Sequence, residues 1–285
     1  MRSVLNTIKF IVAHPLCSGR PLSALWRYVR WQAESSIRHE LEFQWIAGAK
    51  LVVRKGMTGA TGNIYCGLHE FSDMAFVLHF LQPLDNFVDV GANVGSYSVL
   101  ASAVCGARTV ALEPDPTTIE FLTRNVNVNR IQSRVTIIDA ALGATQGTAD
   151  FTIGRDTRNK MAKADERETR VVRVNTLDEI VRDAAPILVK IDVEGFEADV
   201  IAGAKNTLGR PELMAILIET VDDDVRHTLN SHGFFEVHYE PRSRVLSQTE
   251  DQAGRGANFL FVRSIEACTE RVKRAPPRQI LHQLI

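Results

Sequence analysis

The sequence predicts an α/β fold with a doubly wound, mostly parallel sheet of seven strands and helices on both faces. Three observations support this prediction. Between residues 83 and 265, short apolar runs alternate with stretches of helical periodicity, as in parallel sheets with crossover helices. The apolar run Phe87–Val90 leads through a glycine turn, Gly91–Gly95, into a helix. The next apolar run ends at an acid, Glu113, which is typical of a nucleoside-binding sheet.

The expected core elements follow from this rhythm. We expect strands near residues 86–90, 108–112, 134–138, 187–191, 213–218, 233–239 and 258–263, and helices near 95–104, 116–128, 176–183, 196–207 and 222–232. No helix separates the last two strands, so the last one should run antiparallel to the rest. Residues 148–175 interrupt the rhythm with two further strands around a polar stretch, 155–168. Long polar loops of this kind are often lids, although a surface insertion without a role remains an alternative.

The N-terminal residues 1–48 form a basic, amphipathic helical extension in this prediction. Apolar residues recur at helical spacing after Pro21, which suits a first helical turn: Leu22, Leu25, Trp26, Val29, Ala33 and Ile37. Such a helix could contact an anionic membrane surface or a partner, or it could pack its apolar stripe on the main domain. Residues 49–82 should form a hairpin over 51–66 and a helix over 72–81 capped by Ser72 or Asp73.

Composition excludes several classes of protein. The chain has 285 residues, 45% of them hydrophobic, and a net charge of −1, so we expect no nucleic-acid partner. Its four cysteines form no C-x-x-C pair, which leaves a zinc ribbon or redox motif unsupported and favours a reducing compartment. We expect neither a signal peptide nor a membrane span. The prediction is a cytoplasmic protein, peripheral to the membrane if the N-terminal helix binds there, with a weakly ordered basic tail over 266–285.

The acids beside the glycine turn indicate the cofactor. Asp89 stands two residues before Gly91, and a carboxylate there would repel the pyrophosphate that a dinucleotide fold binds. It suits a cationic ligand with an amino group, such as S-adenosylmethionine. Glu113 lies about 20 residues beyond the turn, where an acid commonly accepts hydrogen bonds from ribose hydroxyls. The sequence therefore favours S-adenosylmethionine over a nicotinamide dinucleotide.

A second motif, Lys190–Glu197 (KIDVEGFE), is a buried strand that ends in an acid-x-acid-Gly turn. Together with residues 89–98, Glu113–Pro116 and Gly67–Glu70, it resembles the FkbM-type S-adenosylmethionine-dependent methyltransferases over about residues 62–264. The resemblance implies a Rossmann-like class I methyltransferase domain at 83–265. It also implies cofactor-binding roles, with the methionyl end and the ribose floor held by Asp89, Gly91, Asn93 and Gly95, the ribose hydroxyls by Glu113, the adenine by Asp139-Ala140, and the pocket completed by Glu70 and Asp192.

The same resemblance implies O-methylation of a hydroxyl on a sugar, glycan or secondary metabolite. Such a transfer needs close in-line positioning and removal of the hydroxyl proton. Asp192 and Glu194 are the candidates for orientation or general base, and Lys190 could pair with an acid or contact the substrate. Asp192, Glu194 and Glu219 could also supply oxygens to Mg²⁺.

Other functions remain open at this stage. The Asn/Asp-Pro-Pro-aromatic sequence of base amino-methyltransferases is absent after the fourth strand, where Asp192-Val-Glu-Gly stands instead. A nucleic-acid or protein methyltransferase is nevertheless an alternative, as is a non-catalytic scaffold of a glycan assembly complex that retains the cofactor pocket. A dehydrogenase is disfavoured by Asp89.

Overall fold

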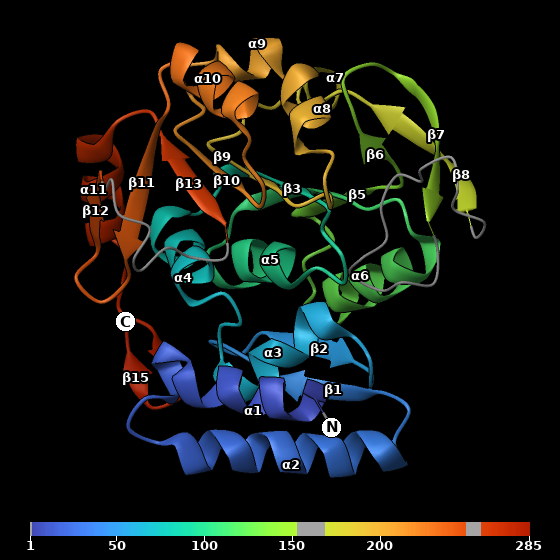
Figure 1. The fold of residues 1–285 in the computed structure, drawn as a ribbon, viewed down its shortest axis with the longest axis vertical. Helices are drawn as coiled ribbons and strands as arrows, with labels where there is room; N and C mark the ends of the chain where they lie inside the picture. Colours follow the sequence, from blue (N-terminus) through green and yellow to red (C-terminus); the bar gives the residue numbers. More distant parts are fainter. Residues whose placement is uncertain (1, 153–168, 249–257) are drawn as a thin grey trace.

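The computed structural model describes residues 2–152, 169–248 and 258–285, and its centre is a sheet of eight strands (Figure 1). Their order is β12-β11-β13-β10-β9-β3-β4-β5. The bounds are β3 Asn86–Val90, β4 Arg108–Leu112, β5 Val135–Ile138, β9 Leu188–Ile191, β10 Ala215–Ile218, β11 Phe235–Glu240, β12 Val245–Ser247 and β13 Phe259–Val262. Strand β13 lies antiparallel between β10 and β11, as predicted. The predicted count of seven is one too low because β12 is three residues long and too short to show a pattern.

Helices cover both faces of this sheet (Figure 1). On one face lie α4 Phe71–Phe80, α5 Ser96–Val99 with its π-helical continuation Leu100–Val104, and α6 Pro116–Val128; on the other lie α7 Leu177–Ile180, α8 Glu197–Ala202, α9 Lys205–Leu208 and α10 Asp223–Ser231. Strands β9 and β10 are buried at every residue, as expected for parallel strands covered on both sides. The helix predicted over 196–207 is broken at Gly203, where a Cβ would overlap the carbonyl of Gly143.

The N-terminal segment forms a separate layer beneath α6 (Figure 1). It contains α1 Arg2–Ala13, the short 3-10 turn η1 Pro15–Cys17, α2 Pro21–Ile37, β1 Leu41–Gln44, β2 Lys50–Val53 and α3 Thr58–Cys66. The hairpin predicted over 51–66 is wrong, since β2 pairs with β1 and the following residues form α3. Gly67 ends α3 at φ 81°, with its amide bonded to Asn63. The glycines that suggested a turn instead allow close packing, because a Cβ on Gly62 would overlap the His69 ring.

Helix α2 has two apolar faces. Its inner face buries Ala24 and Trp31 in a cluster that includes α3 residues. Most of the stripe that the sequence singled out faces solvent instead: Leu22 is 80% exposed, Trp26 67% and Ile37 84%. The interpretation that this stripe packs on the main domain is therefore wrong for these residues.

The C-terminal tail, predicted to be weakly ordered, is folded onto the core. It contains α11 Ile265–Lys273 and a small hairpin of β14 Gln279–Ile280 and β15 Gln283–Leu284. Arg271 donates to the carbonyl of Phe80 at 2.6 Å and Arg278 to that of Val104 at 3.2 Å, while Ile280 and Ile285 join the main apolar cluster. The prediction failed because these contacts join residues far apart in the sequence.

Two further predictions are partly met. Residues 148–175 do contain two strands, β7 Gly147–Thr152 and β8 Thr169–Asn175, which form a side sheet with β6 Ala141–Leu142; the polar stretch 155–168 lies outside the described residues. Helix α4 begins after Glu70 rather than at a Ser72 or Asp73 cap.

Within the described ranges, no helix has the length and apolar character needed to cross a bilayer.

Candidate functional site

A pocket of about 260 Å³ opens where β3, β4 and β9 end, at the edge of the sheet where open α/β folds bind ligands. The α3–α4 connection and β7 complete its walls. Of the residues predicted from the sequence, those that line it are Glu70, Asp89, Gly91, Asn93, Glu113, Ala140, Lys190, Asp192, Glu194 and Glu219. Gly95 and Asp139 do not line it. Asp139 is exposed, and its backbone carbonyl accepts a hydrogen bond from Arg173.

The glycine turn is shaped by contacts within the protein. Gly91 has φ 75°, and a Cβ there would overlap the backbone carbonyl oxygen of Asp192. Gly95 has φ 88°, and a Cβ there would overlap Leu122 of α6. The two glycines thus let the turn pack between the end of β9 and α6, because only a residue without a Cβ adopts this backbone at such close range. Gly95 consequently supports the glycine turn through its close approach to α6, without lining the pocket.

Glu113 is held by the turn that it faces. Its Oε2 accepts a hydrogen bond from the amide of Asn93, and its Oε1 accepts one from the amide of Asp115, both at 2.9 Å. Burial raises the pKa of this carboxyl to about 7. Each oxygen keeps a second lone pair, so the carboxyl can still accept hydrogen bonds from a ligand in the pocket.

Asp89 is a buried carboxyl with one oxygen unsatisfied. Its Oδ2 accepts a hydrogen bond from the hydroxyl of Ser98 at 2.7 Å. Its Oδ1 has no hydrogen-bond partner among the described residues, and burial raises the pKa of the carboxyl. Leaving such an oxygen unpaired costs free energy, and a donor group in the pocket would recover it.

Lys190 is the buried cation of the site. Its Nζ lies 2.6 Å from Asp192 Oδ2 and 4.7 Å from the centre of the Tyr97 ring. Burial opposes the charge, but Asp192, Asp89 and Glu70 together raise the pKa of Lys190. The ion pair that the sequence suggested for Lys190 is therefore present. The ammonium group of Lys190 is neutralised by carboxylates of the protein itself.

Asp192 and Glu219 form a hydrogen-bonded pair of carboxyls with opposite pKa shifts. Burial opposes ionisation of Asp192, yet the adjacent Lys190 lowers its pKa. Burial, followed by the charge of Asp192, raises the pKa of Glu219 to about 8, so Glu219 is protonated at neutral pH and hydrogen-bonds to Asp192.

A magnesium ion at these carboxyls would compete with Lys190 for Asp192. Within the described ranges, Asp192, Glu194 and Glu219 also do not converge as a ligand set, so the magnesium prediction gains no support.

Several site residues were missed from the sequence. The Tyr97 hydroxyl donates to Glu70, and Asp73, buried in α4, accepts hydrogen bonds from the backbone and side-chain amides of Asn258 at 3.0 and 2.9 Å. Tyr97 lies inside the glycine-turn motif and could have been suspected. Nothing around Asn258 signalled a role, because its partners lie about 185 positions earlier in the chain.

The last acid of the second motif has a structural role. Glu197 is buried, and its Oε1 accepts weak hydrogen bonds from the amides of Val193 and Gly195 at 3.4 and 3.3 Å. It therefore holds the turn that presents Asp192 and Glu194 to the pocket. Glu194 itself has φ 51°, a left-handed conformation that is uncommon for a residue other than glycine.

Parts of this chain match known methyltransferase sequences. The family model described as the methyltransferase FkbM domain matches residues 89–236. The hexuronic acid methyltransferase AglP of Haloferax volcanii is 30% identical over 123 residues, which are 42% of this chain and 50% of AglP. The methyltransferase sdnD of Sordaria araneosa is 28% identical over 169 residues, 47% of this chain and 65% of sdnD. The chain thus matches between half and two thirds of the length of these relatives.

Among solved structures, precorrin-6y C5,15-methyltransferase from Geobacter metallireducens aligns with 67% of this chain and 86% of its own. The sequence identity is 18% and the TM-score is 0.40.

Proposed function

Because this chain belongs to the FkbM methyltransferase domain family, we propose that it transfers a methyl group from S-adenosylmethionine to a hydroxyl of a sugar or glycan. The observation that carries the proposal is the unpaired, buried Asp89 Oδ1 in a pocket that Glu113 and Asp192 also line. A ligand that offers an ammonium group and a ribose satisfies the first two of these acids.

The described residues fit this cofactor. Asp89 would accept hydrogen bonds from the amino group of its methionyl end, and Glu113 would accept them from the ribose hydroxyls. Ala140, which lines the pocket without a bulky side chain, would border the base. When bound, the cofactor supplies a methyl group made electrophilic by its sulfonium. A dinucleotide fits less well, because its pyrophosphate would face the acids of the same wall.

Acidic side chains also line the acceptor side of the pocket. Asp192, Glu194 and Glu219 come from the ends of β9 and β10, and carboxylate oxygens are suited to orienting neighbouring sugar hydroxyls. Asp192 is ionised at neutral pH and would accept the hydrogen bond of the attacking hydroxyl. The proton lost by that hydroxyl would pass to Asp192, because Glu219, with its pKa raised to about 8, is already protonated at neutral pH. A sugar acceptor also agrees with the hexuronic acid named for AglP.

Calorimetric titration of the full chain with S-adenosylhomocysteine tests the cofactor. We expect saturable binding, and no binding of NADH. Asp89→Asn should weaken binding by about 1–3 kcal/mol, the value of a hydrogen bond to a charged group. Asp139→Asn is the matched control and should bind like the wild type, because Asp139 is exposed and outside the pocket. Equal losses in both variants, or no binding by folded wild-type protein, would remove the basis of the proposal.

Transfer of labelled methyl groups tests the acceptor. Glycans with neutral hexoses and with hexuronic acids are offered separately, together with RNA and a protein extract as alternative acceptors. We expect label on a sugar hydroxyl, and a turnover reduced about 100-fold or more in Asp192→Asn, as general acid–base catalysis contributes at least that much. Label on RNA or protein alone would replace the sugar proposal with the corresponding alternative.

We further propose that α1 and α2 bind an anionic membrane surface. Residues 2–38 carry six lysines and arginines and one acid, Glu34, which pairs with Arg30 at 2.7 Å. Exposed apolar side chains lie on the same two helices, on α2 (Leu22, Trp26, Val29, Ile37) and on α1 (Val4, Leu5, Phe10, Val12). Apolar anchors flanked by cations suit the boundary between anionic headgroups and acyl chains.

Vesicle co-sedimentation tests this surface. The protein should bind phosphatidylglycerol vesicles more tightly than phosphatidylcholine vesicles, and added salt should weaken the binding. Trp26→Ser should reduce binding about tenfold, since burying a large side chain contributes more than 1.4 kcal/mol. Val171→Ser, at an exposed apolar residue of β8, should have no effect. A different result would contradict the proposal: the wild type does not bind vesicles but self-associates, and Trp26→Ser no longer self-associates. This face would then be an interface between copies of the chain.

A further inference from the structure

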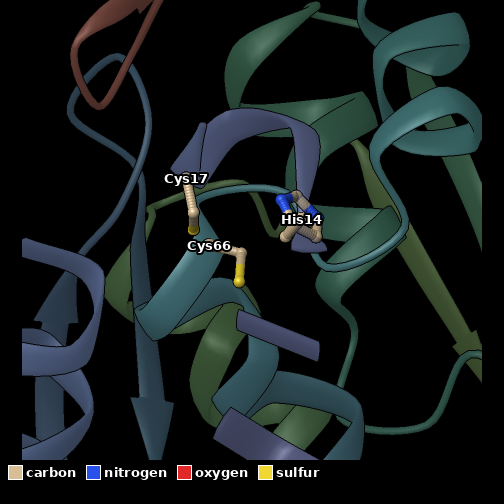
Figure 2. Close-up of side chains that lie close together, drawn as sticks. All are labelled: His14, Cys17 and Cys66. Atoms are coloured by element: carbon tan, nitrogen blue, oxygen red, sulfur yellow. The ribbon is translucent and has the colours of Figure 1, made fainter. Parts of the chain in front are cut away.

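Three potential metal ligands meet outside the pocket (Figure 2). His14 immediately precedes η1, Cys17 ends η1, and Cys66 ends α3. One ligand atom from each of the three lies within 4.8 Å of the others. His14 is 5% exposed and both cysteines are fully buried. Neither cysteine forms a disulfide. In the described part of the chain, no other group of histidine, cysteine or acidic residues converges in this way.

We propose that His14, Cys17 and Cys66 form a binding site for a thiophilic metal ion. Thiolate sulfur with imidazole nitrogen is the donor set that selects soft or borderline ions, above all Cu(I) and Zn²⁺. Buried polar groups that come together from distant parts of a chain also need a reason to be there, because packing alone is satisfied by apolar residues.

The surroundings of His14 suit a metal ligand. Its Nε2 lies 3.2 Å from the carbonyl oxygen of His69, so a proton on Nε2 would be donated to that oxygen. Nδ1 would then carry a lone pair, which accepts a hydrogen bond from the Leu16 amide at 3.2 Å. A metal ion bound at Nδ1 would replace this hydrogen bond. Imidazole ligands are commonly oriented in this manner by a carbonyl on their other nitrogen.

Charge and ligand number favour the monovalent ion. The guanidinium of Arg27 is held by the Tyr65 carbonyl at 2.6 and 2.8 Å, and its Nη2 is 4.0 Å from Cys17 Sγ. Two thiolates, Arg27 and Cu(I) sum to zero charge, whereas Zn²⁺ would leave a buried net charge of one. Structural zinc sites almost always have four ligands, and the described residues contribute three side chains here.

An ion at this position would tie the N-terminal layer to a wall of the pocket. Helix α3 contributes Gly59 to the pocket. Its Asn63 donates to the Ser96 hydroxyl at 3.3 Å and accepts from the His69 amide at 2.8 Å. Both Ser96 and His69 line the pocket. A ligand bond from Cys66 to an ion shared with η1 would therefore restrain α3 and its contacts.

Metal titration of the reduced full chain tests the site. Cu(I) is added anaerobically against bicinchoninate, and Zn²⁺ separately against a chromophoric chelator. We expect one Cu(I) per chain, bound more tightly than Zn²⁺, and a higher thermal unfolding midpoint when it is bound. Cys17→Ser and Cys66→Ser should lose both the ion and the rise in midpoint. Cys268→Ser, at a buried free cysteine outside the cluster, should keep both.

X-ray absorption of the copper-loaded wild type tests the ligands without any variant. Two sulfurs and one nitrogen around the ion would support the proposal even if the serine variants fail to fold. Absence of a retained ion in the reduced wild type, or retention by folded Cys66→Ser, would overturn it. A disulfide between Cys17 and Cys66 after mild oxidation, with no ion bound by the reduced protein, would also overturn it and identify a redox pair instead.

Discussion

Lys190→Ala should lower the free energy of unfolding by about 3–5 kcal/mol, the usual cost of removing one partner from a buried ion pair. Lys190 is 2% exposed, and its ammonium offsets the charges of Asp192, Asp89 and Glu70. Without it, these carboxyls either ionise unpaired or take up protons. Urea unfolding of the wild type and the variant measures the difference. Lys205→Ala, at an exposed lysine of α9, is the control and should stay within about 0.5 kcal/mol of the wild type.

The loss in free energy of unfolding caused by Lys190→Ala should grow with pH. Lys190 lowers the pKa of both Asp89 and Asp192, so its removal raises these values in the folded state only. The folded variant then binds more protons than its unfolded chain, and its stability falls as pH rises from the unfolded carboxyl pKa towards the raised folded values. Unfolding at about pH 5 and about pH 8 should show the larger deficit at the higher pH. A deficit that is constant or larger in acid would show that Lys190 does not hold these carboxyls.

Gly91→Ala should abolish binding of S-adenosylhomocysteine and lower the free energy of unfolding by about 2–5 kcal/mol, the sum of left-handed backbone strain and overpacking. The added Cβ would overlap the Asp192 carbonyl, so the turn must move away from β9. That movement would displace Asn93, whose amide holds Glu113. Differential scanning calorimetry and ligand titration measure the two effects.

Gly56→Ala separates backbone strain from overlap. Gly56 has φ 98° and nothing within 4 Å of an added Cβ, so this variant should lose only the strain contribution, about 1–2 kcal/mol, and bind the ligand normally. Equal stability losses in the two variants would mean that the close approach of Gly91 to β9 contributes nothing.

The positions of the site acids followed from local patterns. Asp89, Glu113 and Asp192 each come at or just beyond the end of a buried strand, and parallel strands bring such ends to one edge of a sheet. The order of the strands in the sheet and the exposure of individual side chains could not be predicted from such local patterns. Asp139 is also next to a strand end, yet it is exposed, and the adjacent Ala140 takes the place in the pocket wall.

The buried electrostatics could not be predicted because they depend on residues from several elements. The sequence placed Lys190 and Asp192 on one side of a strand and suggested an ion pair, which is present. It did not indicate that Tyr97 and Glu70 complete the surroundings of this pair, or that burial and the charge of Asp192 raise the pKa of Glu219. Glu219 belongs to the neighbouring strand end, and its contact with Asp192 requires β10 to lie beside β9.

By itself, the sequence determined the central α/β sheet, the glycine turn and the strand-end acids, because apolar runs and glycine spacing are signals within a few residues of each other. Only the tertiary structure decided that residues 58–66 form a helix, that the C-terminal tail is ordered, and that His14 and Cys17 meet Cys66. Each of these outcomes depends on burial against segments distant in the chain, and burial energy outweighs local propensity when a short segment could adopt either conformation.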